Sequence, residues 1–62
     1  MDQVAEFKNG AYVVLEAPSF PGGMSSVFIR DPQGNIHDKI RCDSRTQARE
    51  YFRAFKKIAK NL

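Results

Sequence analysis

Basic and aromatic side chains alternate along two stretches that flank the segment DPQGN. The residues are Phe28 and Arg30 before the segment, and His37, Lys39 and Arg41 after it. Because successive side chains of a strand point to opposite faces, residues two positions apart share a face. Cationic groups neutralise phosphate, and aromatic rings stack on bases or pack on sugars. The pattern therefore indicates a nucleic-acid-binding surface, with DNA as the expected partner.

Two further residues belong to this candidate site. Tyr12 shares its predicted face with Glu16, which should point to water, and Arg45 opens the basic C-terminal segment. The candidate nucleic-acid-binding residues are Tyr12, Phe28, Arg30, His37, Lys39, Arg41 and Arg45. Two other interpretations stay open. The Tyr12 and Phe28 face could close a homodimer or bind another protein, or it could simply shield the sheet backbone from water.

The residue types that carry catalysis or bind metals are not arranged for either purpose. The lone histidine, His37, has no second histidine, and the segment PGG lacks the strand-to-helix context of a phosphate-binding loop. Cys42 is expected on the opposite sheet face from His37, as a small core residue. Asp31, Asp38 and Asp43 are expected in a turn, a strand and a helix cap. We therefore expect no enzymatic activity, no metal or other cofactor and no small-molecule substrate.

Glycine and proline positions predict where the strands begin and end. The loop APSFPGG, residues 17–23, follows a β-branched apolar stretch over 11–16 that predicts a strand. Asn9-Gly10 favours a type I′ turn, so an additional edge strand before it is an open alternative. In RDPQGN, Pro32 presets φ and Gly34 supplies a positive φ, which predicts a hairpin between strands 25–30 and 35–41.

A turn centred on Pro32 and Gln33 also predicts a register. It would place Phe28 opposite His37 and Ile29 opposite Ile36. A slip of one residue would turn a lysine and an arginine into the core, so the pattern disfavours it. Asp38 is the polar exception on the inner face, expected near an edge or a basic partner.

After Cys42 the apolar period changes from two to that of a helix. Apolar residues recur at 48, 51, 52, 55, 58, 59 and 62, which predicts an amphipathic helix over 44–61. Ser44 and Gln47 fit a capping box, and Lys57 and Lys60 suit the negative end of the helix dipole.

These elements predict one α+β domain over residues 1–62. A three-stranded antiparallel meander of strands 11–16, 25–30 and 35–41 would carry the C-terminal helix on one face (βββα). The expected core residues are Val13, Leu15, Val27, Ile29, Ile36, Ile40, Ala48, Phe52, Phe55 and Ile58.

Charge is unevenly distributed along the chain, whose net charge is +3. Residues 45–62 hold six cationic residues against one glutamate, whereas residues 1–16 hold one lysine against three acidic residues. A basic end attracts polyanions, although a solvated helix face is the alternative interpretation. A single cysteine and no apolar run of about 20 residues indicate a reducing compartment and no membrane span. We expect a small cytoplasmic protein, since the acidic N-terminus does not fit a secretory signal.

The order strand, strand, DPQGN turn, strand, then SRTQAREYF opening an amphipathic helix resembles the arm-binding N-terminal domain of tyrosine recombinases. It is also similar to the plant ethylene-response-factor DNA-binding domain. The similarity covers residues 10–60, with Lys39 and Arg41 matching the basic second hairpin strand. The resemblance implies three strands backed by a helix, and a sheet that reads the DNA major groove. It also implies an accessory or regulatory DNA-binding protein of a mobile element.

Overall fold

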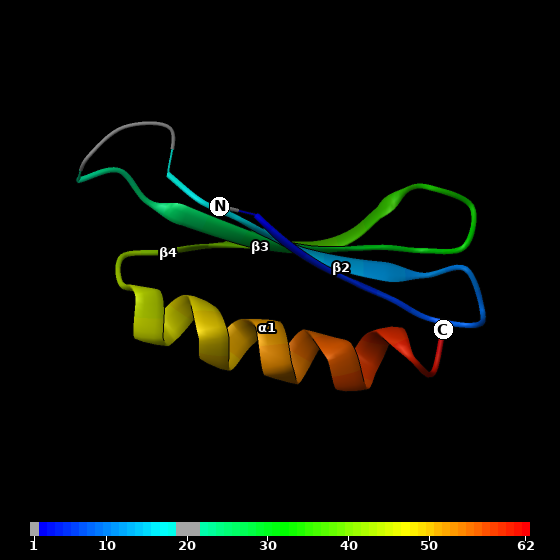
Figure 1. Cartoon of the computed structure of the whole chain (residues 1–62). Coiled ribbons are helices and arrows are strands. Elements are labelled where there is room, and N and C mark those ends of the chain that lie inside the picture. Colours follow the sequence, from blue (N-terminus) through cyan, green and yellow to red (C-terminus); the bar gives the residue numbers. More distant parts are fainter. Residues whose placement is uncertain (1, 19–21) are drawn as a thin grey trace.

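Four antiparallel strands form one sheet, and a single helix covers one of its faces (Figure 1). The computed structural model describes residues 2–18 and 22–62. The elements are β1 (Gln3–Glu6), β2 (Tyr12–Glu16), β3 (Ser25–Arg30), β4 (Ile36–Cys42) and α1 (Arg45–Ala59). The predicted α+β class, the antiparallel meander and the C-terminal helix are confirmed, but the sheet has four strands and not three. The order β1-β2-β3-β4 makes β1 and β4 the edges.

β1 is the strand that the sequence left as an open alternative. The Phe7 N–H donates to the Ala11 carbonyl at 2.9 Å, and the Gly10 N–H donates to the Phe7 carbonyl at 3.0 Å. Gly10 has a φ of 93°, whereas Asn9 does not have a positive φ. A type I′ turn needs positive φ at both central residues, so that prediction is wrong. The loop is instead a type I turn followed by a left-handed glycine.

The β3–β4 loop closes in the same way. The Gly34 N–H donates to the Asp31 carbonyl and the Asp31 N–H donates to the Asn35 carbonyl, both at 2.9 Å. Gly34 has a φ of 90°. The Asp31 carboxylate accepts from the N–H groups of Gln33 and Asn35 at 3.0 and 2.9 Å. The predicted two-residue turn is therefore wrong, because the left-handed glycine adds a residue to the loop.

The register of β3 and β4 consequently differs by two residues from the prediction. The longer loop shifts the pairing by one residue, and a bulge between Ile29 and Arg30 shifts it by another. Phe28 thus lies opposite Lys39, not His37, and Ile29 lies opposite Asp38. Since a shift of two residues preserves the sheet face, Phe28 and Lys39 still share a face. Asp38 lies on the edge strand, as expected.

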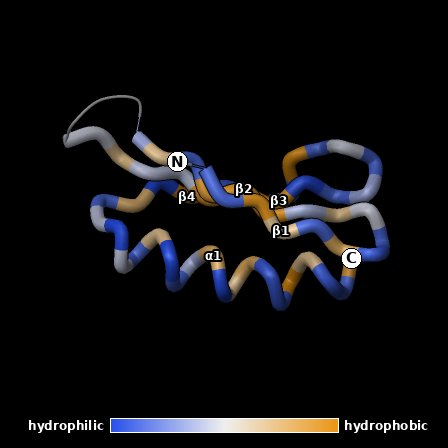
Figure 2. The backbone as a smooth tube through the Cα atoms, viewed as in Figure 1, coloured by the Kyte–Doolittle hydropathy of each residue, from blue (hydrophilic) through white to orange (hydrophobic). Residues whose placement is uncertain are grey.

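The core lies between the sheet and α1, and Figure 2 shows the hydrophobic segments of β2 and β3 in the middle of the sheet. Its buried residues are Ala11, Val13, Leu15, Val27, Ile29, Cys42, Ala48, Phe55 and Ala59, with Ile40 and Phe52 partly buried against them. Two predicted core residues are exposed, Ile36 by 49% and Ile58 by 41%. Ile36 pairs with Arg30 beyond the bulge, and Ile58 is one position off the buried line of Ala48, Phe55 and Ala59.

Both ends of α1 are held by side-chain hydrogen bonds. The Gln47 N–H donates to Ser44 Oγ at 3.1 Å, and Gln47 Oε1 accepts from the Asp43 N–H at 3.2 Å. The predicted capping residues are confirmed, although Gln47 reaches one residue further back than in a capping box. At the other end, Asn9 Nδ2 donates to the carbonyls of Ala59 and Leu62, both at 2.9 Å. The C-terminus accordingly lies beside the β1–β2 loop (Figure 1).

Candidate nucleic-acid interface

The sheet face that α1 does not cover, here the open sheet face, carries three rows of side chains across the strands. Cross-strand partners share a face, so each row follows from the register. The middle row is Val4, Val14, Phe28 and Lys39, the row toward the hairpin loops is Glu6, Tyr12, Arg30 and Ile36, and the third row is Glu16, Ser26 and Arg41. Five of the seven predicted site residues therefore lie on one face, as the alternation indicated: Tyr12, Phe28, Arg30, Lys39 and Arg41.

Phe28 is buried within this face, with only 8% of its surface exposed. The Arg30 guanidinium carbon and the Lys39 Nζ each lie 5.6 Å from the centroid of its ring. The middle row of a four-stranded sheet has neighbours on both sides, and they cover the ring. The expectation that Phe28 is an exposed aromatic is therefore wrong. The ring holds two cations by cation–π interaction, and its face is not free to stack on a base.

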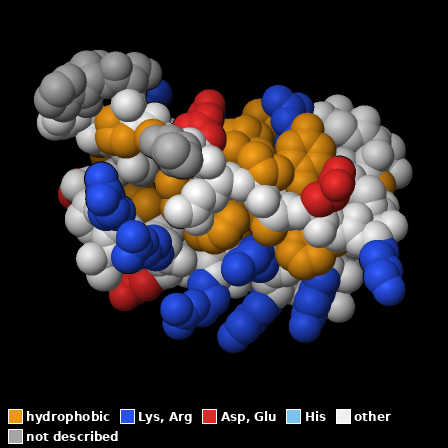
Figure 3. Space-filling view, in the orientation of Figure 1, with side chains coloured by type: hydrophobic (Ala, Val, Ile, Leu, Met, Phe, Trp, Pro, Cys, Tyr) orange, Lys and Arg blue, Asp and Glu red, His pale blue; other side chains and the backbone are white. Residues whose placement is uncertain are grey.

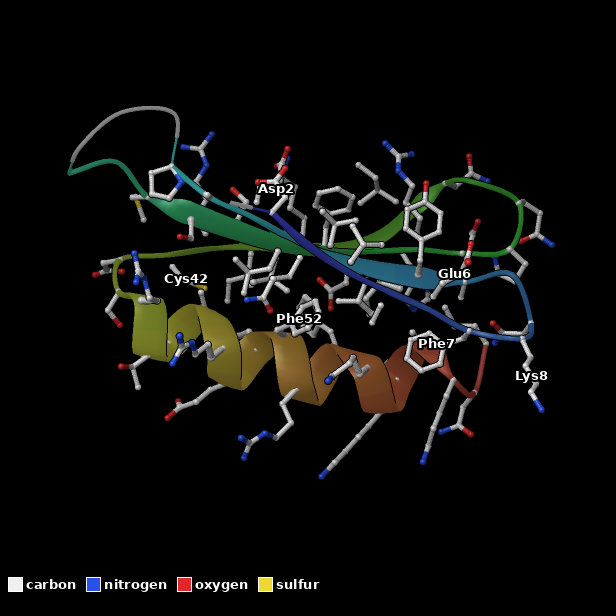
Figure 4. The ribbon with its side chains drawn as sticks, viewed as in Figure 1. Asp2, Glu6, Phe7, Lys8, Cys42 and Phe52 are labelled. Carbon is white, nitrogen blue, oxygen red and sulfur yellow. The ribbon has the colours of Figure 1, made fainter. Side chains whose placement is uncertain are left out.

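The open sheet face is divided by charge. β1 and β2 contribute Glu6 and Glu16, and Asp2 lies on the same side of the sheet, away from α1 (Figure 4). The Asp2 carboxylate accepts from the Ala17 N–H at 2.9 Å. β3 and β4 contribute Arg30, Lys39 and Arg41, so an acidic half lies beside a basic half.

The two remaining predicted site residues lie elsewhere. His37 is exposed at the bulge, between the paired positions 36 and 38 of β4. Arg45 is the first residue of α1 and therefore belongs to the helix layer, not to the open sheet face. Within the face, Arg30 also donates from Nη1 to the Gly34 carbonyl at 2.7 Å, which ties its guanidinium to the β3–β4 loop.

The densest positive charge lies on α1. Five cationic residues recur at spacings of four, four, three and four, which places them along one side of a helix. They are Arg45, Arg49, Arg53 and Lys56 of α1 together with Lys60, the C-cap residue of α1, here the basic stripe. Figure 3 shows a row of Lys and Arg side chains along the helix layer. Glu50, the one acidic residue of α1, is not at a position of this spacing. The sequence showed an excess of positive charge in residues 45–62, and the bounds of α1 show that five of the cationic residues lie along one side of the helix axis.

Two residues of the basic stripe lie beside sheet residues, and a third lies over an aromatic ring of α1. Lys56 Nζ lies 5.0 Å from the centroid of the Phe52 ring, so its ammonium group is held close to the helix. At the start of the stripe, Arg45 and Arg49 line an open groove of about 220 Å³. The other lining residues are Gln3, Leu15, Ala17, Pro18 and Ser25. The start of the stripe therefore lies beside the first residue of β1, Gln3, and the end of β2, at Leu15.

Cys42 is the last residue of β4, its side chain lies between the sheet and α1, and only 1% of it is exposed (Figure 4). Burial raises the pKa of the Cys42 thiol, and the neighbouring Asp43 carboxylate adds to the rise. The predicted core role of Cys42 is confirmed. Among residues 2–18 and 22–62, no group of three or more His, Cys, Asp and Glu side chains is placed to hold a metal ion.

Within the described part of the chain, no helix has the length and apolar character needed to cross a membrane. Comparison with protein-family models, with curated proteins and with solved structures finds no match for this chain. The candidate function therefore depends on the surface chemistry described above.

Proposed function

We propose that this protein binds nucleic acid, most simply double-stranded DNA, through the basic stripe of α1. The observation that carries the proposal is the placement of five cationic side chains along one side of one helix, with no acidic residue at the same spacing. Four of the five are exposed, and the fifth, Lys56, is held over an aromatic ring. Such a surface attracts a polyanion before any specific contact forms.

The length of the stripe suits several simultaneous phosphate contacts. Lys60 follows Arg45 by 15 residues, each of which adds a rise of about 1.5 Å, so the stripe is roughly 22 Å long. Double-stranded DNA carries about one negative charge per 1.7 Å of its axis. Contacts of this kind are made to the backbone and carry no sequence information by themselves. We therefore expect binding that depends weakly on DNA sequence and strongly on salt.

The open sheet face is the second surface to test, since Lys39 and Arg41 are exposed there. We rank it below the stripe for two reasons. Its acidic half, with Glu6 and Glu16, would repel a duplex lying across the sheet. In addition, the Phe28 ring is covered by its neighbours. The fourth strand also separates this sheet from the three strands that the resemblance to recombinase and ethylene-response-factor domains implies.

Fluorescence anisotropy with a short labelled duplex, titrated over a series of salt concentrations, tests the proposal. If all five cations contact phosphate, the logarithm of the association constant should fall with the logarithm of salt with a slope of about −4 to −5. The double variant Arg49→Ala and Arg53→Ala should reduce the slope by about two and weaken binding at least tenfold at low salt. Both residues are exposed on a helix, where alanine is well tolerated.

The matched control removes the same charge from the other surface. Lys39→Ala with Arg41→Ala should leave the affinity within about threefold and the slope within about one of the unaltered protein. If this pair abolishes binding while the α1 pair does not, the sheet is the contact surface. No binding of the unaltered protein at low salt would overturn the proposal altogether.

A further inference from the structure

The open sheet face exposes apolar side chains at both of its edges. Val4 on β1 is 62% exposed and Ile36 on β4 is 49% exposed. Tyr12 and Val14 of β2, which lie between these edges, are half-buried. A small domain buries a smaller fraction of its surface than a large one, and exposed apolar surface is typical of an interaction site. The face is therefore suited to a partner that covers these side chains.

The charges on this face make it complementary to itself. Asp2, Glu6 and Glu16 lie on the β1–β2 side, while Arg30, Lys39 and Arg41 lie on the β3–β4 side. We propose that two copies of this chain pack open sheet face against open sheet face, about a two-fold axis parallel to the strands. The partner is a second copy because the face carries equal numbers of acidic and basic groups in separate halves.

The direction of the axis follows from the charge layout. Rotation about an axis parallel to the strands lays the β1–β2 half of one copy over the β3–β4 half of the other, so acidic groups meet basic groups at both sides. Rotation about an axis across the strands would lay acidic on acidic and basic on basic. In the favoured arrangement, Arg41 of one copy lies beside Asp2 and Glu16 of the other, and Val14 lies over Phe28. Val14 and Phe28 then form an apolar centre, while Arg41, Asp2 and Glu16 lie at the rim, as in other interfaces.

The size of the face predicts a weak, concentration-dependent dimer. Four strands spaced by about 4.8 Å and five residues long at about 3.4 Å each give a face of roughly 300–400 Å² per copy. A specific stable interface buries about 800 Å² per partner, so this contact belongs to the small, transient class. α1 and its basic stripe lie on the other side of the sheet, so the dimer would leave both stripes free. The inference is independent of the proposed nucleic-acid function.

A charge-swap experiment by sedimentation equilibrium tests this arrangement. The unaltered protein is expected to approach twice its monomer mass as the concentration rises toward the millimolar range at low salt. The single variants Arg41→Glu and Glu16→Lys should each stay monomeric over the same range, because each homodimer would bring like charges together twice. An equimolar mixture of the two variants should regain the dimer. In the mixed dimer, Glu16 of the Arg41→Glu chain meets Arg41 of the Glu16→Lys chain, and the two introduced charges, which are opposite, meet each other.

Each outcome decides the question. Arg41 and Glu16 are both exposed, so the Arg41→Glu and Glu16→Lys variants should keep the circular dichroism spectrum of the unaltered protein. Arg53→Glu on α1 is the matched control and should dimerise as the unaltered protein does. A monomer at every concentration would overturn the inference. So would a dimer that Arg41→Glu does not weaken, or a mixture of the two variants that stays monomeric.

Discussion

Phe28 contributes to the stability of the fold although it lies on the open sheet face, which α1 does not cover. Its ring lies in the middle row of the open sheet face, with 8% of its surface exposed. It does not belong to the helix-side core, and its neighbours on the open sheet face are Val14, Arg30 and Lys39. The long aliphatic parts of Arg30 and Lys39 can cover apolar surface while their charged ends remain in water. This second small cluster therefore contributes to stability and positions two cations.

Substitutions at Phe28 separate packing from cation binding. Phe28→Ala should lower the free energy of unfolding by about 3 kcal/mol, because a buried aromatic ring is lost. For a domain of this size, with a stability of about 3–5 kcal/mol, about 0–2 kcal/mol would remain, so up to about half of the molecules would be unfolded. Phe28→Leu should cost only about 1 kcal/mol, since it keeps an apolar side chain and loses the cation–π interactions. Urea denaturation followed by circular dichroism measures both, and a loss below about 1 kcal/mol for Phe28→Ala would show that the ring is not packed.

At the scale of elements, the two hairpins share one loop design and one of them also fastens the helix. Each loop is a type I turn that ends in a left-handed glycine, Gly10 in the first and Gly34 in the second. Asn9 in the first loop accepts from the Ala11 N–H at 2.9 Å through Oδ1. Its Nδ2 donates to the carbonyl of Ala59, the last residue of α1, and to that of Leu62, three residues further on. The first hairpin thus satisfies helix-terminal groups that a helix cannot satisfy by itself.

Replacement of Asn9 tests this connection. Asn9→Ala removes three hydrogen bonds and should lower the free energy of unfolding by about 2 kcal/mol. Asn61→Ala is the matched control, because it removes one exposed hydrogen bond, from Nδ2 to the Lys57 carbonyl. It should change stability by no more than about 0.5 kcal/mol. Equal effects of the two substitutions, measured by urea denaturation, would mean that Asn9 does not join the hairpin to α1.

At the scale of the whole molecule, one thin core is enclosed by one sheet and one helix. The Cα atoms extend over 34 × 18 × 17 Å, and the buried residues other than Phe28 form a single cluster between the two layers. Cys42 belongs to that cluster, under the first turn of α1. Because so few residues form the core, the thiol should become accessible only when the sheet and helix separate. Its reactivity therefore reports on opening of the whole molecule.

Alkylation of Cys42 measures that opening. The thiolate is the reactive species, and burial raises the thiol pKa, so the folded protein should react slowly at neutral pH. With a stability of about 3–5 kcal/mol, the rate should be lower than in denaturant by a factor of roughly 10² to 5 × 10³. The raised pKa also means that the free energy of unfolding should fall as pH rises above the ordinary thiol range. Alkylation in buffer at the fully denatured rate would contradict the buried position of Cys42.

The features that the sequence determined by itself are those set by neighbouring residues. Gly34 and Asp31 placed the second hairpin loop, and Ser44 with Gln47 placed the start of α1, because turns and caps are made within a few residues. The change of apolar period after Cys42 distinguished strands from helix. The alternation along β3 and β4 assigned Phe28, Lys39 and Arg41 to one face, since parity survives any even shift of register.

The tertiary structure decided what depends on partners distant in sequence. β1 has only four residues, and its strand conformation depends on hydrogen bonding to β2, which its own short pattern does not encode. The bulge beside Arg30 put Ile36 and Asp38 on opposite faces although they are two positions apart, and so moved Ile36 out of the core. Phe28 became buried because neighbours from two other strands cover it, and Glu6 reached the open sheet face because β1 joined the sheet. The burial of a side chain and the charge of a surface depend on all residues that are close in space, whereas a sequence pattern shows only the residues that are close along the chain.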